Sequence, residues 1–377
     1  CEWNGQTIPH GARIGAYTSD QATAEGNYCE IKTRVCENGN LNGSGEFESC
    51  RAVCLIENRT YLPGETMRIF SNKYFLTCLF MALMLVSGYN QDALNNDIVV
   101  AKGATPHLIA SNFSFTEGPA ADAKGNVYFT DQPNDRIMLW KTDGTLTEYM
   151  KGAGRSNGLF FDKKGNLMSC ADEHNQLWQI DQNKNVTVLI KDFEGKRLNG
   201  PNDLWIHPGG GIYFTDPFYK RDYWDHSTQE ITQQRVYYFD PMQNKINIVA
   251  DDLVRPNGII GTHDGKTLYV ADIGGQKTYV YQINSDGSLS GKKLFYELGS
   301  DGMTIDKKCN VYLTGKGVTV VDHTGHKVAQ IPIDAPWTAN VTFGGKNRKT
   351  LFITASKSVY TLDMKVIHLK RRNKLES

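Results

Sequence analysis

Six polar residues recur along the chain, each opening a similar apolar segment, at intervals of 39 to 55 residues. They are Glu117, Asn157, Asn202, Asn257, Asp301 and Asn340. Hard divalent cations prefer oxygen ligands from carboxylates, carboxamides, carbonyls and water. Four of the six combine two carboxylates with two carboxamides, namely Glu117, Asn202, Asn257 and Asp301. If the fold brings these four together, they suit a divalent ion that keeps positions open for water and substrate.

The ion expected at such a site is Ca²⁺ or another hard divalent cation such as Mg²⁺ or Mn²⁺. The four side chains offer no nitrogen or sulfur ligand, so Zn²⁺ is less favoured. The alternative is that these residues only cap strand starts and turns, as Asn and Asp often do. Their shared position in the repeat, with Glu117 where other units have Asn, favours the metal site.

The segment that follows Asn202 shows how each polar residue is positioned. An apolar run at 204–206 is followed by a tight turn at 208–211 and a second apolar run at 212–215. Six such units have the spacing of four-stranded propeller blades. The sequence therefore predicts an all-β fold, a six-bladed β-propeller over residues 107–364. Residues 99–101 or 107–110 are expected to complete the sheet of the last blade.

The chain direction in such a propeller gathers the six polar residues. The first strand of each blade lines the central channel and starts at one mouth, so its opening residue lies on the ring around that mouth. Loops between second and third strands overhang the same mouth, and the longest predicted one spans residues 217–230. Long loops in compact domains are often lids or binding loops. The aromatic residues of this loop include Tyr219, Tyr223 and Trp224.

Composition limits the possible partners. The chain has 377 residues with 41 basic and 41 acidic side chains, so it offers no electrostatic case for nucleic acid or an anionic membrane. No H-E-x-x-H or P-loop pattern occurs in the sequence. A small-molecule substrate is therefore the expected partner, and the oligomeric state is left open.

The first 54 residues differ from the rest of the chain. They are polar and contain Cys1, Cys29, Cys36, Cys50 and Cys54. A segment this short buries little apolar area, so it is predicted to be a small disulfide-held unit with unassigned pairing. Zinc binding is the alternative, although paired C-x₂-C motifs are missing.

Residues 55–89 read as a linker followed by a segment with the form of a secretory signal peptide. Arg68 and Lys73 precede an apolar run at 75–86 that is short for a membrane span. We expect translation of the propeller to begin at Met67, with export to the periplasm or the extracellular space. An internal membrane anchor is the rival interpretation. Residues 90–106 are a predicted linker, and residues 365–377 a basic tail.

Four short motifs carry a resemblance to a known family. They are EGP at 117–119, RLNGPND at 197–203, RPNG at 255–258 and SDGM at 300–303. Over residues of about 107–364 the chain resembles the gluconolactonase / senescence-marker-protein (regucalcin) family of six-bladed propellers. The resemblance implies a central divalent ion held by the four residues named above, and hydrolysis of sugar lactones. The alternatives are a phosphotriesterase-like or aryl-ester hydrolase, and a non-catalytic ligand-binding propeller with a structural ion.

The implied chemistry assigns roles to further residues. A cation at the mouth would polarise the lactone carbonyl while water attacks. Asp301 is the first candidate for general base, and Asp203 the second, because a cation lowers the basicity of a carboxylate that binds it. The expected substrate contacts lie around the same mouth. They are Asn157 and His174 at sugar hydroxyls, Arg197 near the PND motif, and Trp224 with Tyr223, which either stack on the sugar or pack the lid.

Overall fold

The computed structural model describes residues 96–367 in full and, before them, only the backbone of eight short strands. These strands are β1 (Glu2–Trp3), β2 (Gln6–Thr7), β3 (Arg13–Tyr17), β4 (Gln21–Thr23), β5 (Ile31–Glu37), β6 (Asn40–Asn42), β7 (Arg51–Ile56) and β8 (Arg59–Tyr61). The chain divides into two compact units, Cys1–Asn90 and Gln91–Ser377. The predicted disulfides, the signal-peptide-like segment and residues 368–377 of the basic tail lie outside the described side chains.

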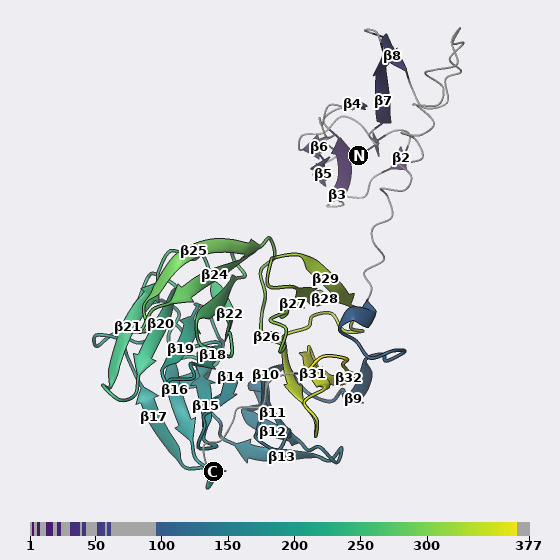
Figure 1. Ribbon diagram of the computed structural model, residues 1–377. Helices are drawn as coiled ribbons and strands as arrows, with labels where there is room; N and C mark the ends of the chain where they lie inside the picture. The colour runs from purple at the N-terminus through teal and green to yellow at the C-terminus, as the bar shows by residue number, and fades with distance from the viewer. Residues whose placement is uncertain are drawn as a thin grey trace. The chain divides into compact units, whose positions relative to one another are not determined.

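The second unit is a ring of six four-stranded antiparallel sheets (Figure 1). The innermost strands are β10 (Thr116–Ala121), β14 (Ser156–Phe161), β18 (Leu204–Ile206), β22 (Pro256–Gly261), β26 (Met303–Ile305) and β30 (Asn340–Gly344). The second strands are β11 (Val127–Asp131), β15 (Leu167–Ala171), β19 (Ile212–Asp216), β23 (Thr267–Asp272), β27 (Val311–Gly315) and β31 (Thr350–Ala355). This arrangement confirms the predicted six-bladed propeller.

The outer half of each blade completes the sheets. The third strands are β12 (Arg136–Trp140), β16 (Gln176–Ile180), β20 (Arg235–Asp240), β24 (Lys277–Ile283), β28 (Gly317–Val321) and β32 (Ser358–Asp363). The outermost strands are β13 (Leu146–Lys151), β17 (Val186–Ile190), β21 (Lys245–Ala250), β25 (Leu289–Tyr296), β29 (Lys327–Ile331) and β9 (His107–Ala110). Three single 3₁₀ turns are also present, η1 (Asn96–Ile98), η2 (Gln132–Asn134) and η3 (Asp172–His174).

Both ends of the propeller sequence build the last blade. β9 precedes the first blade in the chain, yet it pairs antiparallel with β32, with Leu108 opposite Tyr360. A further bridge joins Val100 to Met364. Both segments expected to complete the final sheet therefore contribute to it, and the ring is closed by hydrogen bonds between residues about 250 positions apart in the chain.

Burial decreases from the channel outward and accounts for the repeated sequence pattern. The first five residues of β10 are all buried, whereas β13 has no buried residue. Aromatic side chains pack between blades, as where Phe352 of β31 contacts Phe129 of β11, with ring centroids 5.3 Å apart. Fully burying a large apolar side chain contributes about 1.5–3 kcal/mol. These interblade layers hold the inner strands, and the residues that open them, in fixed positions.

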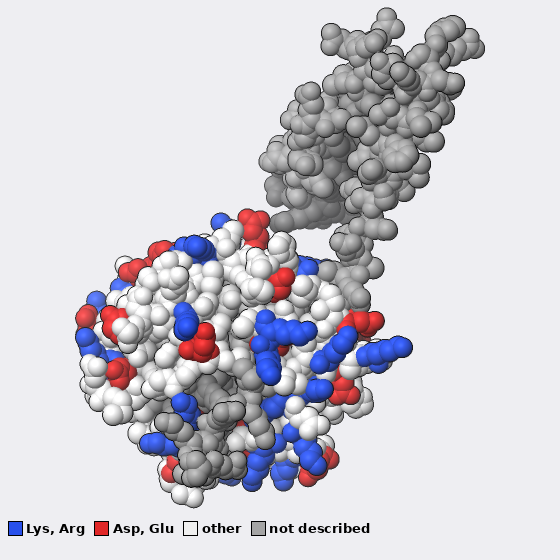
Figure 2. Space-filling view, viewed as in Figure 1, with Lys and Arg blue, Asp and Glu red and all other residues white. Residues whose placement is uncertain are grey.

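The surface carries both signs of charge. On the face shown in Figure 2, basic and acidic side chains occur side by side around the propeller. Among the described residues, no helix combines the length and apolar character that crossing a membrane would require.

Candidate active site

The six opening residues gather where the inner strands begin. The inner strands contact one another in sequence around the channel, and β30 returns to contact β10. Five of the six side chains are buried, and only Asp301 is partly exposed. The structure therefore brings the four residues predicted to bind a cation to one mouth of one channel.

Glycine next to the opening residue allows this close approach. Gly118 has φ of +44°, and a Cβ atom there would lie 1.9 Å from the carbonyl oxygen of Asn157 in the next blade. A Cβ atom at Gly258 would lie 2.5 Å from the carbonyl oxygen of Asp301. No side chain fits at such distances, which explains the glycines of the EGP and PNG motifs.

The third blade carries Asp203 at the position that glycine occupies after Glu117 and Asn257. Its carboxylate is buried and accepts a hydrogen bond from the backbone N–H of Leu204 at 2.9 Å. Asp203 and Asn340 also line a cavity of about 890 Å³, which continues along the channel to Asp122 and Lys164 in turns at the opposite end. The aspartate therefore places a carboxyl group inside the channel, beneath the mouth.

Three carboxylates of the mouth have raised pKa values. Burial, followed by the negative charge of Asp301, raises the pKa of Glu117 well above its usual value. Burial raises the pKa of Asp203 to about 8. Burial also raises the pKa of Asp301 to about 6, although hydrogen bonds from Trp337 and Asn257 oppose that rise. Within residues 96–367, none of the three forms an ion pair with a basic side chain.

The hydrogen bonds at the mouth leave oxygen atoms available. The Nδ2 atom of Asn257 donates to Asp301 Oδ1 at 2.9 Å and to the Tyr219 hydroxyl at 3.0 Å, so its Oδ1 atom remains an open acceptor. The buried Asn202 side chain makes no hydrogen bond with any described residue. The Glu117 carboxylate accepts a bond from the N–H of Gly118 at 3.0 Å and is also hydrogen-bonded by the Asn340 side chain.

This donor set fits a hard cation, because uncompensated buried carboxylates and free amide oxygens are the ligands that such an ion takes. No group of three or more His, Cys, Asp or Glu side chains in the described part of the chain has the arrangement of a metal site. The predicted set contains only two residues of those types, with two asparagines completing it.

The structure separates the predicted substrate contacts. Asn157 is buried on the ring around the mouth. His174 is exposed and stacks on Trp178, with ring centroids 5.2 Å apart. Arg197 pairs with Glu230 at 3.2 Å and with Asp225 at 3.7 Å, so its guanidinium is bound by the loop between β19 and β20.

Trp224 lies inside the lid. Only 8% of the residue is exposed, its Nε1 atom donates to the carbonyl oxygen of Asp172 at 2.8 Å, and its ring stacks on His226 at 4.7 Å. Of the two roles considered for Trp224, packing the lid is the one that these contacts support. The lid spans residues 217–234, four residues more than expected from the sequence.

A lid anchor was missed from the sequence. The buried carboxylate of Asp172 accepts hydrogen bonds from the Tyr223 hydroxyl, from Arg221 Nε at 2.9 Å and from Gln132 Nε2 at 3.3 Å. Together with the bond from Trp224 to the Asp172 carbonyl, these contacts fasten the lid of the third blade to the second blade.

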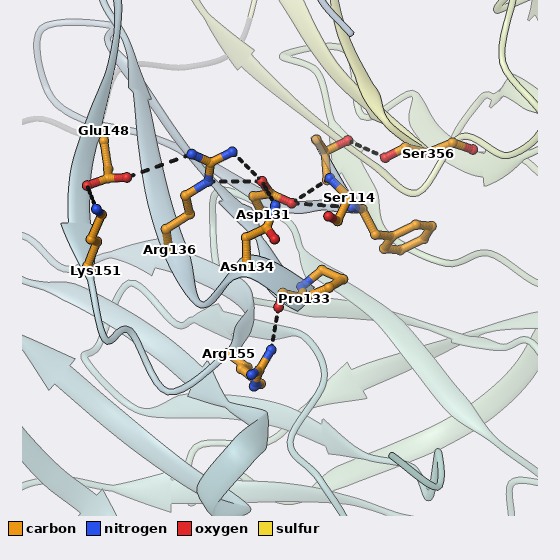
Figure 3. Close-up of polar contacts among 11 residues, drawn as sticks. Ser114, Asp131, Pro133, Asn134, Arg136, Glu148, Lys151, Arg155 and Ser356 are labelled. Atoms are coloured by element: carbon orange, nitrogen blue, oxygen red, sulfur yellow. Dashed lines mark hydrogen bonds and ion pairs between the residues drawn. The ribbon is translucent and has the colours of Figure 1, made fainter. Parts of the chain in front are cut away.

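The signal for this anchor is a shift of one position in the repeat. Asp131 ends the second strand of the first blade and accepts the N–H groups of Ser114 and Phe115 at 2.9 and 3.3 Å, while Arg136 approaches its other oxygen (Figure 3). In the second blade Ala171 occupies that position, opposite Ser156, and Asp172 follows it. Because of this shift, the carboxylate of Asp172 binds Arg221 and Tyr223 of the lid instead of the loop that precedes its own blade.

Other residues at the mouth were also unassigned. Trp337 donates its Nε1 hydrogen to Asp301 Oδ2 at 2.6 Å, and Tyr219 accepts the hydrogen bond from Asn257. Both come from loops without a repeated motif, so only the folded arrangement brings them to the site.

Comparisons with known proteins agree with this architecture. Residues 115–357 match the family described as SMP-30/Gluconolactonase/LRE-like region. A gluconolactonase of Zymomonas mobilis is 28% identical over 210 residues, covering 51% of this chain and 59% of the relative. The chain thus spans about six-tenths of the length of that relative.

Two solved structures share the propeller. A gluconolactonase from Xanthomonas campestris is 26% identical with a TM-score of 0.66, covering 70% of this chain and 91% of its own. A calcium-binding protein, regucalcin, from Agrobacterium tumefaciens is 18% identical with a TM-score of 0.60, covering 71% and 98%, and shows likeness of fold alone. The family match extends over more than half of the sequence and includes all six opening residues. The chain belongs to the SMP-30/gluconolactonase/LRE-like family of six-bladed propellers.

Proposed function

We propose that the protein hydrolyses a sugar lactone, with Glu117, Asn202, Asn257 and Asp301 holding a hard divalent cation such as Ca²⁺. The observation that carries this proposal is the proximity of Glu117 and Asp301 at the channel mouth, two neighbouring carboxylates that form no ion pair with a basic side chain within residues 96–367. Burial of a carboxylate without a counter-charge is costly, and a divalent cation removes that cost. The gluconolactonase names of two relatives support the choice of a lactone as substrate.

The surrounding residues orient the site. When bound, the cation would supply Lewis-acid polarisation of the lactone carbonyl. Tyr219 and Asp301 accept both amide hydrogens of Asn257 and so direct its oxygen away from them. Trp337 holds one oxygen of Asp301. These contacts preorganise the acceptors before substrate arrives, which is the main source of electrostatic catalysis.

Asp301 is the proposed proton acceptor for the attacking water. It is the partly exposed carboxylate of the three, and it shares Asn257 with Tyr219 of the lid, so it lies on the side from which substrate would enter. Asp203 is the second candidate, because it is not among the proposed ligands and its pKa of about 8 is near neutral pH. Asp203 lies in the channel interior, so it would approach the reacting atoms from the channel side.

A pH-stat assay tests the proposal. Gluconolactone, an aryl acetate and a phosphotriester would be offered to the wild type with and without EDTA, and to Asp301→Asn and Asp203→Asn. Asp286→Asn, in an exposed turn, is the control for loss of one carboxylate. Lactone turnover that EDTA abolishes and Ca²⁺ restores is expected. Turnover that EDTA leaves unchanged would contradict the metal site, and a metal-loaded protein inactive on all three substrates would instead be a binding propeller.

We also propose that the propeller is exported, on the strength of the signal-peptide pattern in residues 67–89. The N-terminus of the mature protein, sequenced from cells, tests this. A start close after residue 88 is expected, and a mature chain that retains residues 67–88 would contradict export by cleavage.

A further inference from the structure

Three arginines and two tyrosines form a group at the edge of the lid. The guanidinium carbon of Arg255 lies 5.0 Å from the ring centre of Tyr219, and that of Arg221 lies 5.4 Å from the same ring. Arg155 lies 4.6 Å from the ring centre of Tyr223. Stacking on aromatic faces fixes guanidinium groups in place without using their N–H donors.

This group borders the proposed reacting centre. The hydroxyl of Tyr219 accepts a hydrogen bond from Asn257, and Arg255 is two residues before Asn257 in the chain. Burial raises the pKa of Asp301, and the positive charge of Arg221 is among the interactions that oppose this rise. The arginines therefore lie beside the mouth on its lid side, where the part of a substrate remote from the scissile carbonyl would rest.

Two of the arginines have unused donors. Arg221 uses Nε to bind Asp172, and its terminal nitrogens make no hydrogen bond within residues 96–367. The guanidinium of Arg255 has neither a hydrogen bond nor an ion pair with any residue that the structure describes. Arg155, in contrast, is bound to Glu173 and to the carbonyl of Pro133. A guanidinium with free donors matches carboxylate and phosphate groups in a bidentate geometry.

The two arginines differ in the partners they already have. Arg221 forms an ion pair with Asp172 at 2.9 Å, whereas Arg255 forms no ion pair with any residue that the structure describes. A neutral sugar ring would leave the guanidinium of Arg255 without an anionic partner. An anion carried by the substrate would supply that partner, and the free terminal nitrogens of Arg221 would share in binding it.

We propose that the lactone carries a second, anionic group, a carboxylate or a phosphate remote from the scissile carbonyl, which Arg221 and Arg255 bind. This inference rests on the proposed lactonase function and narrows its substrate class. Arg255 is the better position for a test, because its side chain is exposed and forms no hydrogen bond or ion pair with a described residue.

The test compares kcat/KM for gluconolactone, phosphogluconolactone and glucarolactone, which share a sugar but differ in charge. Wild type is expected to open at least one anionic lactone about ten- to a hundredfold more efficiently than gluconolactone, the range for hydrogen bonds to a charged group. Arg255→Gln should lose most of that preference and change gluconolactone turnover by less than about twofold. Lys164→Gln removes the same charge at the opposite mouth and should change neither.

The outcomes are distinct. Preference for phosphogluconolactone identifies a phosphate, and preference for glucarolactone identifies a carboxylate. Equal turnover of charged and neutral lactones, or an Arg255→Gln variant that slows all of them alike, would overturn the anionic substrate but leave lactone hydrolysis standing. Failure to open any of the three would overturn the proposed function itself. Thermal denaturation of each variant checks that the fold is retained.

Discussion

Two sets of buried carboxylates in this propeller have opposite surroundings. At the rim, where second strands end, Asp131, Asp216 and Asp272 each accept two backbone N–H groups from the loop that precedes their own blade. At the channel mouth, Glu117 and Asp301 face other carboxylates instead. The rim aspartates complete the backbone hydrogen bonding of the scaffold, whereas Glu117 lies beside the carboxylate of Asp301, and neither of the two forms an ion pair with a described basic side chain.

The difference shows that burial alone does not identify a functional acid in this fold. An aspartate recurs at the strand end because a loop there needs its N–H groups satisfied. A carboxylate at the mouth has no such structural reason to be charged. Substitutions should therefore separate the two sets, with the mouth governing activity and the rim governing stability.

The largest expected effect is at the mouth. Asp301→Asn should lower kcat/KM for lactone about a thousandfold or more, because it removes both a proposed cation ligand and the proposed proton acceptor. Stability of the metal-free variant should be equal to or greater than that of wild type, since the repulsion between Asp301 and Glu117 is removed. Steady-state kinetics and thermal denaturation in EDTA measure these effects. A variant that keeps a tenth of wild-type activity would place the reacting centre elsewhere.

Cation removal should make stability depend on pH. The folded pKa of Asp203 is about 8 and that of Asp301 about 6, both above the usual aspartate value, so the unfolded chain releases these protons first. The metal-free protein should therefore lose stability as pH rises from about 4 to about 8. Bound Ca²⁺ should oppose this loss, by about 2.7 kcal/mol at a free concentration of a hundred times Kd.

Melting temperatures at pH 5 and pH 8, with Ca²⁺ and with EDTA, measure that prediction. The stabilisation by Ca²⁺ should be larger at pH 8, because the cation competes with protons for the same carboxylates. A Ca²⁺ effect that is greater at pH 5 would contradict the assignment of these ligands.

Substitution of a rim aspartate should lower stability and leave activity nearly unchanged. Asp131→Ala leaves the N–H groups of Ser114 and Phe115 and the guanidinium of Arg136 without their acceptor, so unfolding free energy should fall by about 2–4 kcal/mol. Folded Asp131→Ala should keep kcat/KM within about twofold of wild type. Denaturant unfolding and active-site-normalised kinetics check this, and a selective loss of activity would remove the distinction between rim and mouth.

Asp172 belongs to neither set. It follows the rim position directly in the sequence, but its carboxylate contacts the lid. Asp172→Asn weakens the charge-assisted bond to Arg221, so KM should rise about tenfold with a smaller change in kcat. Asp216→Asn, at the strand-end position that Ala171 occupies in the second blade, is the control and should affect stability alone. Equal effects on KM from both variants would mean that the lid is not specifically held by Asp172.

The smallest effect is expected from Arg197→Gln. Its guanidinium pairs with Glu230 and Asp225 of the lid, so kcat/KM should change by less than about threefold. A loss of a hundredfold would show that Arg197 leaves these partners to bind substrate.

The repeat made the fold and much of the mouth predictable from the sequence. Apolar–turn–apolar units of constant form gave the blade number, and the residue opening each unit had to lie on the channel. Glu117 and Asp301 were assigned because they share that position. Each inner strand is buried on both faces, and this burial left few alternative registers for the prediction.

The lid was less predictable because it belongs to no repeat. Its length was underestimated by four residues, since a polar loop has no periodicity that marks its end. The contacts of Tyr219 and Trp337 depend on loops from different blades meeting at one point. Asp172 was detectable in principle, by counting from the turn aspartate Asp162, but its partners were not.

Closure of the last blade by β9 has a consequence for how the protein is made. The pairing of Leu108 with Tyr360 cannot form until nearly the whole propeller has left the ribosome. Contacts so distant in sequence slow folding, so β9 has no strand partner while the first five blades form. A circular permutant that joins residue 363 to residue 107 and opens a hairpin turn in the fourth blade would turn this slow final step into a local one.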